Sequence, residues 1–181
     1  MTAATRDMIY DGIADAKTEH SVIKPYVMSH GTMECYSLKE SRRFYEEFLG
    51  LECVRHARPS MVVRCGLKFH IVAVEVGDAL KPVNLLNHWG IDLTSKEEVD
   101  DAYRHALEFK DKYRICQVLA PVSQHGVYSF YLEDLDHNWW EIQYYPGFQN
   151  DDLFDFGDRF AMDDAAEAGQ LAELNVKTST P

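Results

Sequence analysis

The hydrophobic and polar positions of this chain predict strands and helices in an order that occurs twice. Residues 27–36 alternate between polar and apolar side chains, which indicates a strand with one buried face. Residues 38–49 carry apolar side chains at helical spacing, and Gly50 is the predicted helix stop. The predicted core positions of this helix are Phe44, Phe48 and Leu49. Three strand-like runs follow, at residues 51–55, 61–65 and 68–76. The first half is therefore predicted to fold as β-α-β-β-β.

The same order returns after a linker at residues 77–85, which contains glycine and proline. Residues 87–93 predict a strand, and a helix is expected from Ser95 to about residue 113. Its predicted buried stripe consists of Val99, Tyr103, Ala106 and Leu107. Three more strands are expected, at residues 115–119, 127–132 and 139–145, separated by a loop at 121–126 and a turn at 133–138. The second half therefore predicts another β-α-β-β-β module, and the fold class is α+β.

Two histidines occupy the same place in the two halves. His30 and His88 each open a strand-like run, with an acid four residues later and a serine seven residues later. Each serine begins a Ser-x-x-Glu sequence, at 37–40 and 95–98, which is a capping box typical of the start of a helix. The correspondence indicates an internal duplication. Equivalent strands of such a repeat can bring the two imidazoles together across a pseudo-twofold axis.

The segments outside the two modules differ from them in composition. We expect the modules at residues 26–76 and 86–147 of one paired domain, 26–147, with a polar N-terminal arm at 1–25. An acidic C-terminal arm at 148–181 carries Leu153, Phe154, Phe156 and Phe160. Because a wholly disordered tail would be poorer in aromatic residues, we expect this arm to pack on its own domain or on a second subunit.

Charge and cysteine usage narrow the function classes. The net charge of -12 argues against nucleic acid, whose phosphates would repel the chain. No apolar run approaches the length of a membrane span, and the N-terminus lacks the apolar core of a signal peptide, so we expect a cytoplasmic protein with no membrane partner. The cysteines lack a Cys-x-x-Cys pattern and are expected to be buried, reduced thiols. They are Cys35, Cys53, Cys65 and Cys116.

The last predicted strand supplies a third candidate metal ligand. Glu141 alternates with two tryptophans, and a buried carboxylate is costly unless it is paired or coordinates a metal. His30, His88 and Glu141 together form the two-histidine, one-carboxylate donor set of non-haem Fe(II) oxygenases, which leaves open positions on the ion. His70, on the last strand of the first module, is either a ligand or a proton-transfer group. The remaining histidines of note are expected to be solvated (His20, His56, His105) or to serve only a turn (His137).

Residues 26–145 resemble the vicinal oxygen chelate superfamily, which includes glyoxalases, bleomycin-resistance proteins and type I extradiol dioxygenases. The matching residues are His30, the 44–45 and 49–51 segments, His88, and the acidic 133–136 run that leads to Glu141. The resemblance implies paired βαβββ modules that form a cupped mixed sheet around a metal. Within the superfamily the sequence is most similar to a single-domain extradiol ring-cleavage dioxygenase.

The dioxygenase resemblance rests on two strands. Ser129-Phe-Tyr131 is similar to the strand whose tyrosine contacts the substrate, and residues 65–74 are similar to the strand that carries an acid–base histidine. It implies that His30, His88 and Glu141 hold Fe(II), with Mn, Ni or Zn as alternatives. His70 then takes a proton from the substrate and Tyr131 orients it. In the loop before Ser129, Val122 replaces the usual histidine and His125 stands where the usual acid would be. His125 is therefore the third catalytic candidate, beside His70 and Tyr131.

The expected substrates are O2 and a small catechol-type aromatic, the latter bound in a pocket lined by aromatic residues, and a homo-oligomer is expected. The candidate lining residues are Trp89, Tyr128, Tyr131, Trp139 and Trp140. Three other functions stay open. A glyoxalase- or epimerase-like lyase or isomerase would use His70 as a fourth ligand and need no oxygen. A metal-free drug-binding module would have lost the ligands. An interaction protein would act through its C-terminal arm.

Overall fold

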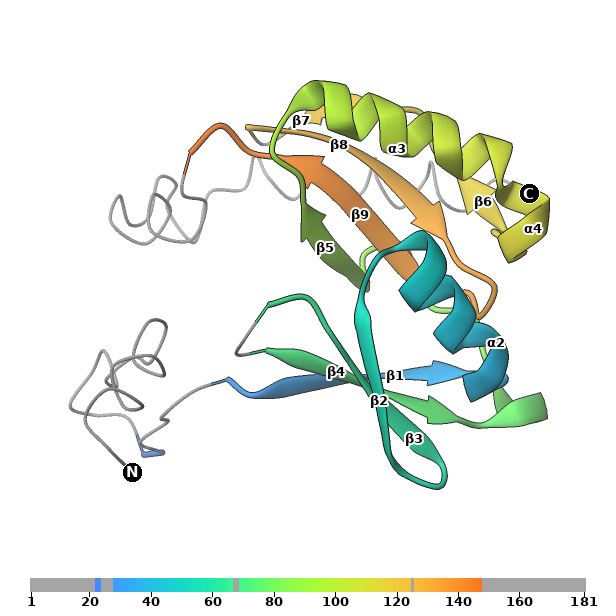
Figure 1. Ribbon diagram of the computed structural model, residues 1–181. Coiled ribbons are helices and arrows are strands. Elements are labelled where there is room, and N and C mark those ends of the chain that lie inside the picture. Colours follow the sequence, from blue (N-terminus) through green and yellow to red (C-terminus); the bar gives the residue numbers. More distant parts are fainter. Residues whose placement is uncertain (1–21, 24–27, 67–68, 125, 148–181) are drawn as a thin grey trace, which may run out of the picture. The chain divides into compact units, whose positions relative to one another are not determined.

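The computed structural model describes residues 22–23, 28–66, 69–124 and 126–147. The chain divides into two compact units, Met1–Pro82 and Val83–Pro181, and each is considered by itself (Figure 1). The expected N-terminal arm, apart from Val22 and Ile23, and the acidic C-terminal arm lie outside the described residues. So does His125.

In the described part of the first unit, one mixed sheet is formed by four strands in the order β1-β4-β3-β2. The strands are β1 (His30–Cys35), β2 (Glu52–Ala57), β3 (Ser60–Arg64) and β4 (His70–Glu75). The first and last strands, β1 and β4, pair in parallel, whereas β2, β3 and β4 pair antiparallel. A short 3-10 helix, η2 (Gly77–Ala79), follows β4. The expected β-α-β-β-β order of this half is confirmed.

Alternation along the strands separates an apolar face of this sheet from a more polar one. Met33 and Cys35 of β1 are buried, whereas His30, Thr32 and Glu34 on the opposite face are exposed. The buried face continues through the neighbouring strands with Met61, Val63, Ile71 and Ala73. The Tyr45 hydroxyl, itself fully buried, donates to Met33 Sδ at 3.8 Å, which places the helical segment against this face.

The single helix expected at residues 38–49 is two pieces. An α-helix, α2 (Leu38–Arg43), is followed directly by a π-helix, η1 (Phe44–Phe48). The wider π turn allows two consecutive aromatic residues, Phe44 and Tyr45, to be fully buried. Tyr45 was not among the predicted core positions of this helix. Phe48 stacks on Phe44 with ring centroids 5.2 Å apart and is only half-buried. Gly50, with φ +70°, ends the segment as predicted.

The N-terminus of α2 is capped by a distant residue, which corrects the expected local capping box. The Ser37 side chain caps no backbone N–H among the described residues. Instead, the Leu38 N–H donates to Glu75 Oε2 at 2.8 Å, across 37 positions of sequence. The Ser37 carbonyl oxygen accepts from the Ser41 N–H at 3.0 Å and from the Ser41 hydroxyl at 2.8 Å. A carboxylate from the sheet thus satisfies a free N–H of the first turn.

In the described part of the second unit, a second mixed sheet has the order β5-β9-β8-β6, and β7 also pairs with β8. Its strands are β5 (His88–Asp92), β6 (Gln117–Val118), β7 (Val122–Gln124), β8 (Val127–Glu133) and β9 (Trp139–Tyr144). β5 and β9 pair in parallel and the other pairs are antiparallel. Figure 1 shows α3 (Lys96–Glu108) lying along β8 and β9. The two sheets repeat the same parallel pairing of first and last strands, so the α+β fold of two βαβββ modules is confirmed.

Strand β7 replaces the loop expected at residues 121–126. Val122 pairs with Ser129, and Gln124 pairs with Val127. Gly126, which precedes β8, has φ +82°. The sequence predicted a loop from Pro121 to Gly126. Residues 122–124, which lie between them, instead extend the antiparallel pairing. The strand is too short to show a period of its own.

The capping box predicted for the second helix is confirmed, with a shift of one residue in its return bond. Ser95 Oγ accepts from the Glu98 N–H at 3.1 Å, and Glu98 Oε2 accepts from the Thr94 N–H at 2.8 Å. α3 ends at Glu108, and a separate turn, α4 (Lys110–Tyr113), follows. Of the predicted stripe, Val99 and Ala106 are fully buried and Tyr103 is half-buried, whereas Leu107 is exposed.

All four cysteines are free thiols, as expected. Cys35 and Cys53 are buried as predicted, but Cys65 and Cys116 are exposed, which corrects the expectation for these two. Burial raises the pKa of the Cys53 thiol to about 12, so this side chain is an inert part of the core. Among the described residues, no helix combines the length and the apolar character needed to cross a membrane.

Candidate metal centre

The second sheet has one face covered by α3 and one face lined with polar side chains. Phe130, Leu132, Trp140 and Ile142 are buried on the covered face, where the Phe130 ring meets Tyr103 at 5.5 Å. Alternate residues of the same strands, together with the first residue of β5, point to the other face. They include His88, Ser129, Tyr131, Glu141 and Gln143. A buried carboxylate and a buried amide on one sheet face are unusual in a structural core.

His88 and Glu141 are in direct contact on this polar face. His88 Nε2 lies 3.2 Å from Glu141 Oε2, and the side chains are 29% and 11% exposed. The other ring nitrogen, His88 Nδ1, lies 2.8 Å from the Leu85 carbonyl oxygen. A carbonyl can only accept, so Nδ1 carries the proton and, in neutral histidine, Nε2 presents its lone pair to the carboxylate. Two acceptors then face each other, and a proton or a cation must lie between them.

The geometry of this pair fits a divalent ion. Metal-binding histidines commonly donate their second ring N–H to a backbone carbonyl, as His88 does to Leu85. Two donor atoms about 2.1 Å from one ion and 3.2 Å apart subtend an angle of about 100° at it, between octahedral and tetrahedral values. The residues present therefore fit a metal at this position.

Without an ion, the pKa shifts of His88 and Glu141 describe a protonated imidazole paired with an ionised carboxylate. The hydrogen bond with Glu141 raises the pKa of His88, although burial opposes this effect. For Glu141, burial favours a higher pKa, but the hydrogen bond with His88 outweighs it and lowers the pKa. The Ser129 and Tyr131 hydroxyls lie near the carboxylate and act in the same direction. The carboxylate is thus ionised at neutral pH, as a metal ligand must be.

A buried hydroxyl beside Glu141 lacks a partner. Among the residues that the structure describes, Ser129 Oγ is the one buried side-chain polar atom without a hydrogen-bond partner of good geometry. Ser129 is fully buried and pairs with Gln143 in the strand register, two positions from the Tyr131–Glu141 pair and on the same face. An orphaned hydroxyl of this kind suits a group bound at the Glu141 carboxylate.

Tyr131 lies over the site from strand β8. Its ring meets the His88 ring edge-on at 5.2 Å, and its hydroxyl accepts from Gln124 Nε2 at 3.2 Å. Burial, followed by the nearby Glu141 carboxylate, raises the pKa of Tyr131, so the phenol is protonated at neutral pH. On the other side of Glu141, Gln143 Nε2 donates to Asp92 Oδ1 at 2.6 Å, which fixes the orientation of the amide.

The first unit brings His30 and His70 together. They are register partners on the parallel strands β1 and β4, and their rings stack with centroids 5.5 Å apart. His30 Nδ1 lies 2.8 Å from the Ser29 hydroxyl. His30 is exposed and His70 is half-buried, so both rings are accessible on the polar face of this sheet.

Strand register refines the equivalence between His70 and Glu141. In the first sheet His30 pairs with His70, and in the second sheet its counterpart His88 pairs with Trp139. His70 therefore corresponds to Trp139, and the counterpart of Glu141, two residues further, is Val72. The strands match as predicted from the sequence, but the positions differ by two residues, which sequence alone could not establish.

The other expected residues divide into core and surface. Trp139 and Trp140 are buried, which favours packing over a substrate cage, and Trp89 is half-buried. Tyr128 lines a cavity of about 550 Å³ in the second unit, together with Lys96, Gln124 and Tyr144. Gln124, which contacts the Tyr131 hydroxyl, was not expected at the site. Asp92 was expected on the His88 face as the acid four residues later, but its contact with Gln143 was not predicted.

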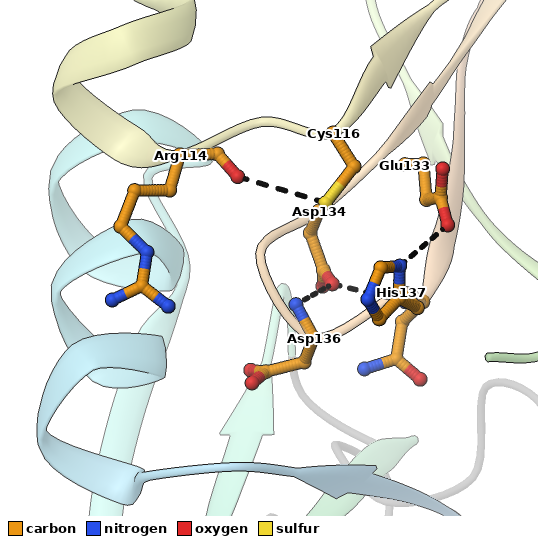
Figure 2. A network of polar contacts seen from close by, with 7 residues as sticks. Arg114, Cys116, Glu133, Asp134, Asp136 and His137 are labelled. Carbon is orange, nitrogen blue, oxygen red and sulfur yellow. Dashed lines mark hydrogen bonds and ion pairs between the residues drawn. The ribbon is translucent and has the colours of Figure 1, made fainter. Parts of the chain in front are cut away.

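A second cluster of metal-binding residue types lies in the second unit and includes none of the expected ligands. The candidate donor atoms of Cys116, Glu133 and His137 all lie within 4.8 Å of one another. Figure 2 shows these side chains around the turn between β8 and β9. His137 Nδ1 lies 2.8 Å from Glu133 Oε1. The sequence had assigned His137 to its turn alone, because the spacing of these residues matches no common metal motif.

No family model matches the sequence, and no curated protein matches it. The fold, however, is shared by solved structures. One is a glyoxalase/bleomycin resistance protein/dioxygenase from Nocardioides, with 17% identity and a TM-score of 0.53 over 71% of this chain and 92% of that chain. A genomically encoded fosfomycin resistance protein from Listeria monocytogenes has 21% identity and a TM-score of 0.53, over 71% and 99% of the two chains. A possible glyoxalase from Bacillus cereus has 22% identity and a TM-score of 0.52, over 64% and 96%.

These identities are too low to carry over an activity, and the likeness concerns the fold. Each solved chain is covered almost completely, by about two thirds of this chain. This chain therefore shares the fold of these glyoxalase-type and resistance proteins.

Proposed function

We propose that the protein is a metal-dependent enzyme of the vicinal oxygen chelate superfamily in which His30, His88 and Glu141 bind one divalent ion. The observation that carries the proposal is the orientation of His88. Its Nδ1–H is held by the Leu85 carbonyl, and its Nε2 lone pair faces the Glu141 carboxylate. His30 enters as the counterpart of His88 in the duplicated sequence, with its Nδ1 beside the Ser29 hydroxyl and Nε2 left for a ligand bond.

The ligand number favours a site with open positions. The counterpart of Glu141 in the first sheet is Val72, which offers no donor atom. Three protein ligands on a divalent ion leave room for substrate oxygens and for O2. This supports an Fe(II)-dependent extradiol ring-cleaving dioxygenase acting on a catechol-type aromatic, in which both oxygen atoms of O2 enter the ring-opened product.

The residues around Glu141 have roles that follow from their protonation. Tyr131 is protonated at neutral pH because its pKa is raised, so its hydroxyl can donate a hydrogen bond to a substrate oxygen. The Gln124 side-chain amide donates a hydrogen bond to the Tyr131 hydroxyl oxygen and so fixes its position. His70, stacked on His30, is the proposed acceptor of the catechol proton. Ser129 would donate its unpaired hydroxyl hydrogen to a group bound at Glu141.

A lyase or isomerase of the same superfamily is the second candidate. It is favoured by the contact between His70 and His30, because a fourth ligand from β4 is what this reaction class would use. Such an enzyme would move a proton on the substrate and consume no oxygen.

Metal content and oxygen uptake test the proposal together. We expect anaerobically purified protein loaded with Fe(II) to retain about one ion at this site and to consume O2 with a catechol, giving a yellow ring-fission product. His88→Ala should lose the ion and the activity. His56→Ala, which removes an exposed histidine from β2, is the matched control and should retain both. Equal retention of metal at this site by His88→Ala and wild type would refute the ligand assignment.

The His70→Gln variant separates the two reactions. If it retains the ion and loses turnover, His70 is an acid–base group, as the dioxygenase requires. Loss of the ion with the activity would make it a ligand and favour the lyase or isomerase. Absence of oxygen uptake across a broad catechol panel, with fully ferrous protein, would exclude the dioxygenase.

A further inference from the structure

We infer that Cys116, Glu133 and His137 form a second metal site, separate from the proposed catalytic ion, that binds Zn²⁺ or a similar borderline divalent cation. A thiol, a carboxylate and an imidazole are the donor types that Zn²⁺ accepts, and three protein donors leave a fourth position open. The three candidate donor atoms lie within 4.8 Å of one another. This inference does not depend on the proposed function.

The three residues come from separate chain segments that are fixed to each other by the sheet. Glu133 ends β8, and its carbonyl oxygen accepts from the Cys116 N–H at 2.8 Å, just before β6 begins. His137 lies in the turn that leads into β9, and its Nδ1 lies 2.8 Å from Glu133 Oε1. Glu133 is 16% exposed and His137 40% exposed at the side chain, so an ion can reach both from solvent.

The turn holds His137 in an unusual conformation. His137 has φ +63°, in the left-handed region that favours glycine or asparagine. The turn around it is fixed by Asp134, whose Oδ1 accepts from the Asp136 N–H at 2.8 Å and the Asn138 N–H at 2.9 Å. The His137 N–H donates to the Asp134 carbonyl at 3.1 Å. A bulky imidazole at a position suited to glycine, held toward a carboxylate, indicates a use for the imidazole.

The charge around the site favours a cation over a reactive thiolate. The same three groups could instead form a cysteine nucleophile, with His137 as its base and Glu133 orienting the base. Glu133 places a carboxylate oxygen within 4.8 Å of the Cys116 thiol. This negative charge disfavours a free thiolate and attracts a divalent ion. In Figure 2 the Arg114 carbonyl faces Cys116, while its guanidinium group extends away from the thiol.

An ion at this position would tie β6, β8 and the β8–β9 turn together. β8 carries Tyr131 and β9 carries Glu141, so the second ion would stabilise the hairpin that holds part of the proposed catalytic site. Its expected effect is on stability and on the reactivity of Cys116, and it can be measured without any substrate.

The experiment uses the full chain in the His88→Ala background, so that failure of the proposed catalytic site is measured separately. Chelator-treated protein is titrated with Zn²⁺, and with Co²⁺, whose thiolate charge-transfer absorption reports a sulfur ligand. We expect one ion to bind with this absorption. We also expect Zn²⁺ to protect Cys116 from alkylation while the exposed Cys65, read in the same peptide map, stays reactive.

Two variants and a control decide the assignment. Cys116→Ser should abolish the charge-transfer absorption, and His137→Asn, which suits the left-handed conformation, should weaken Zn²⁺ binding at least about 100-fold without unfolding the turn. Cys65→Ser should change neither. If Co²⁺ shows no thiolate absorption, or if Cys116→Ser binds Zn²⁺ as tightly as its parent, the site does not exist. Alkylation of Cys116 that is fast and unaffected by Zn²⁺ would favour the nucleophile instead and overturn the inference.

Discussion

Asp134 is a fully buried carboxylate at the turn between β8 and β9, and its replacement by asparagine gives the sharpest test of how this turn is stabilised. Asp134 Oδ1 accepts from the Asp136 and Asn138 N–H groups, and Oδ2 accepts from the Trp140 indole N–H at 2.9 Å. Burial raises the pKa of Asp134 to about 7, although the Trp140 hydrogen bond opposes the shift. Asp134→Asn keeps the shape and removes the titration.

The sign and size of the effect follow from this pKa. Because the folded-state value of about 7 lies above the ordinary value of 3.8, the folded protein holds a proton that the unfolded chain has already lost between these pH values. This contribution to stability is complete below about pH 4 and is lost as the pH rises through about 7. At about 1.4 kcal/mol for each pKa unit, the loss reaches at most about 4 kcal/mol.

The asparagine variant should behave differently at the two ends of the range. Its amide oxygen can keep the two backbone bonds, but its amide N–H₂ faces the Trp140 N–H, which costs about 1–3 kcal/mol at all pH values. We therefore expect wild type to be more stable than Asp134→Asn near pH 4.5. The difference in the free energy of unfolding should shrink or reverse near pH 8.5, and these two pH values, about four units apart, lie on either side of the raised pKa.

Urea denaturation in the presence of a chelator, followed by far-UV circular dichroism across this pH range, measures the effect. Asp111→Asn is the control, because it removes the same charge from an exposed position in α4. If the free energies of unfolding of wild type and Asp134→Asn change in parallel with pH, the three N–H donors lower the pKa of Asp134 by more than burial raises it. The carboxylate would then stay ionised, and the reasoning would be wrong.

Three other predictions follow from single contacts. Glu75→Ala should expose the Leu38 N–H and cost about 0.5–2 kcal/mol, seen as faster amide hydrogen exchange in α2 but not in α3; equal exchange in both helices would contradict the cap. Tyr131→Phe should leave metal binding at His88 and Glu141 intact and lower turnover about 10–100-fold, measured as kcat with a catechol; unchanged kcat would remove Tyr131 from the site. His137→Gly should stabilise the metal-free protein by about 1 kcal/mol, measured by thermal denaturation, because a φ of +63° is strained for a residue with a Cβ atom. A lower Tm would show that the contact between His137 and Glu133 stabilises the protein by more than this strain destabilises it.

The elements that sequence predicted best are those with a clear period. The polar–apolar alternation of β1 is visible in the printed sequence because this strand has one covered face. β4 alternates in burial although most of its side chains are apolar, and β9 is buried along nearly its whole length. Where the structure departs from the pattern, a non-local contact decides. Leu107 has the helical spacing of a buried residue but is exposed, and β7 is defined by its pairing with β8.

The candidate site was predictable in its residue types and not in its arrangement. The repeat of His30 and His88, and the placement of Glu141 on an alternating strand, identified residues that each sheet presents on its polar face. The tautomer of His88 depends on the Leu85 carbonyl, and the offset between His70 and Glu141 depends on strand register. Neither is encoded in local sequence, because both are set by pairing between strands distant in the chain. The contact of His137 with Glu133 and Cys116 was hidden for the same reason.

The two Ser-x-x-Glu sequences also differ in when their helices can form during folding. The cap of α3 is made by Ser95 and Glu98, three residues apart, so it can form in microseconds within an isolated segment. The cap of α2 comes from Glu75, 37 residues away, and must wait until the chain between them has closed its loop and β4 has docked. We therefore expect substitutions in the α3 cap to slow refolding, whereas Glu75→Ala should mainly speed unfolding. The two duplicated halves of the chain would then fold to the same βαβββ arrangement by different kinetic routes.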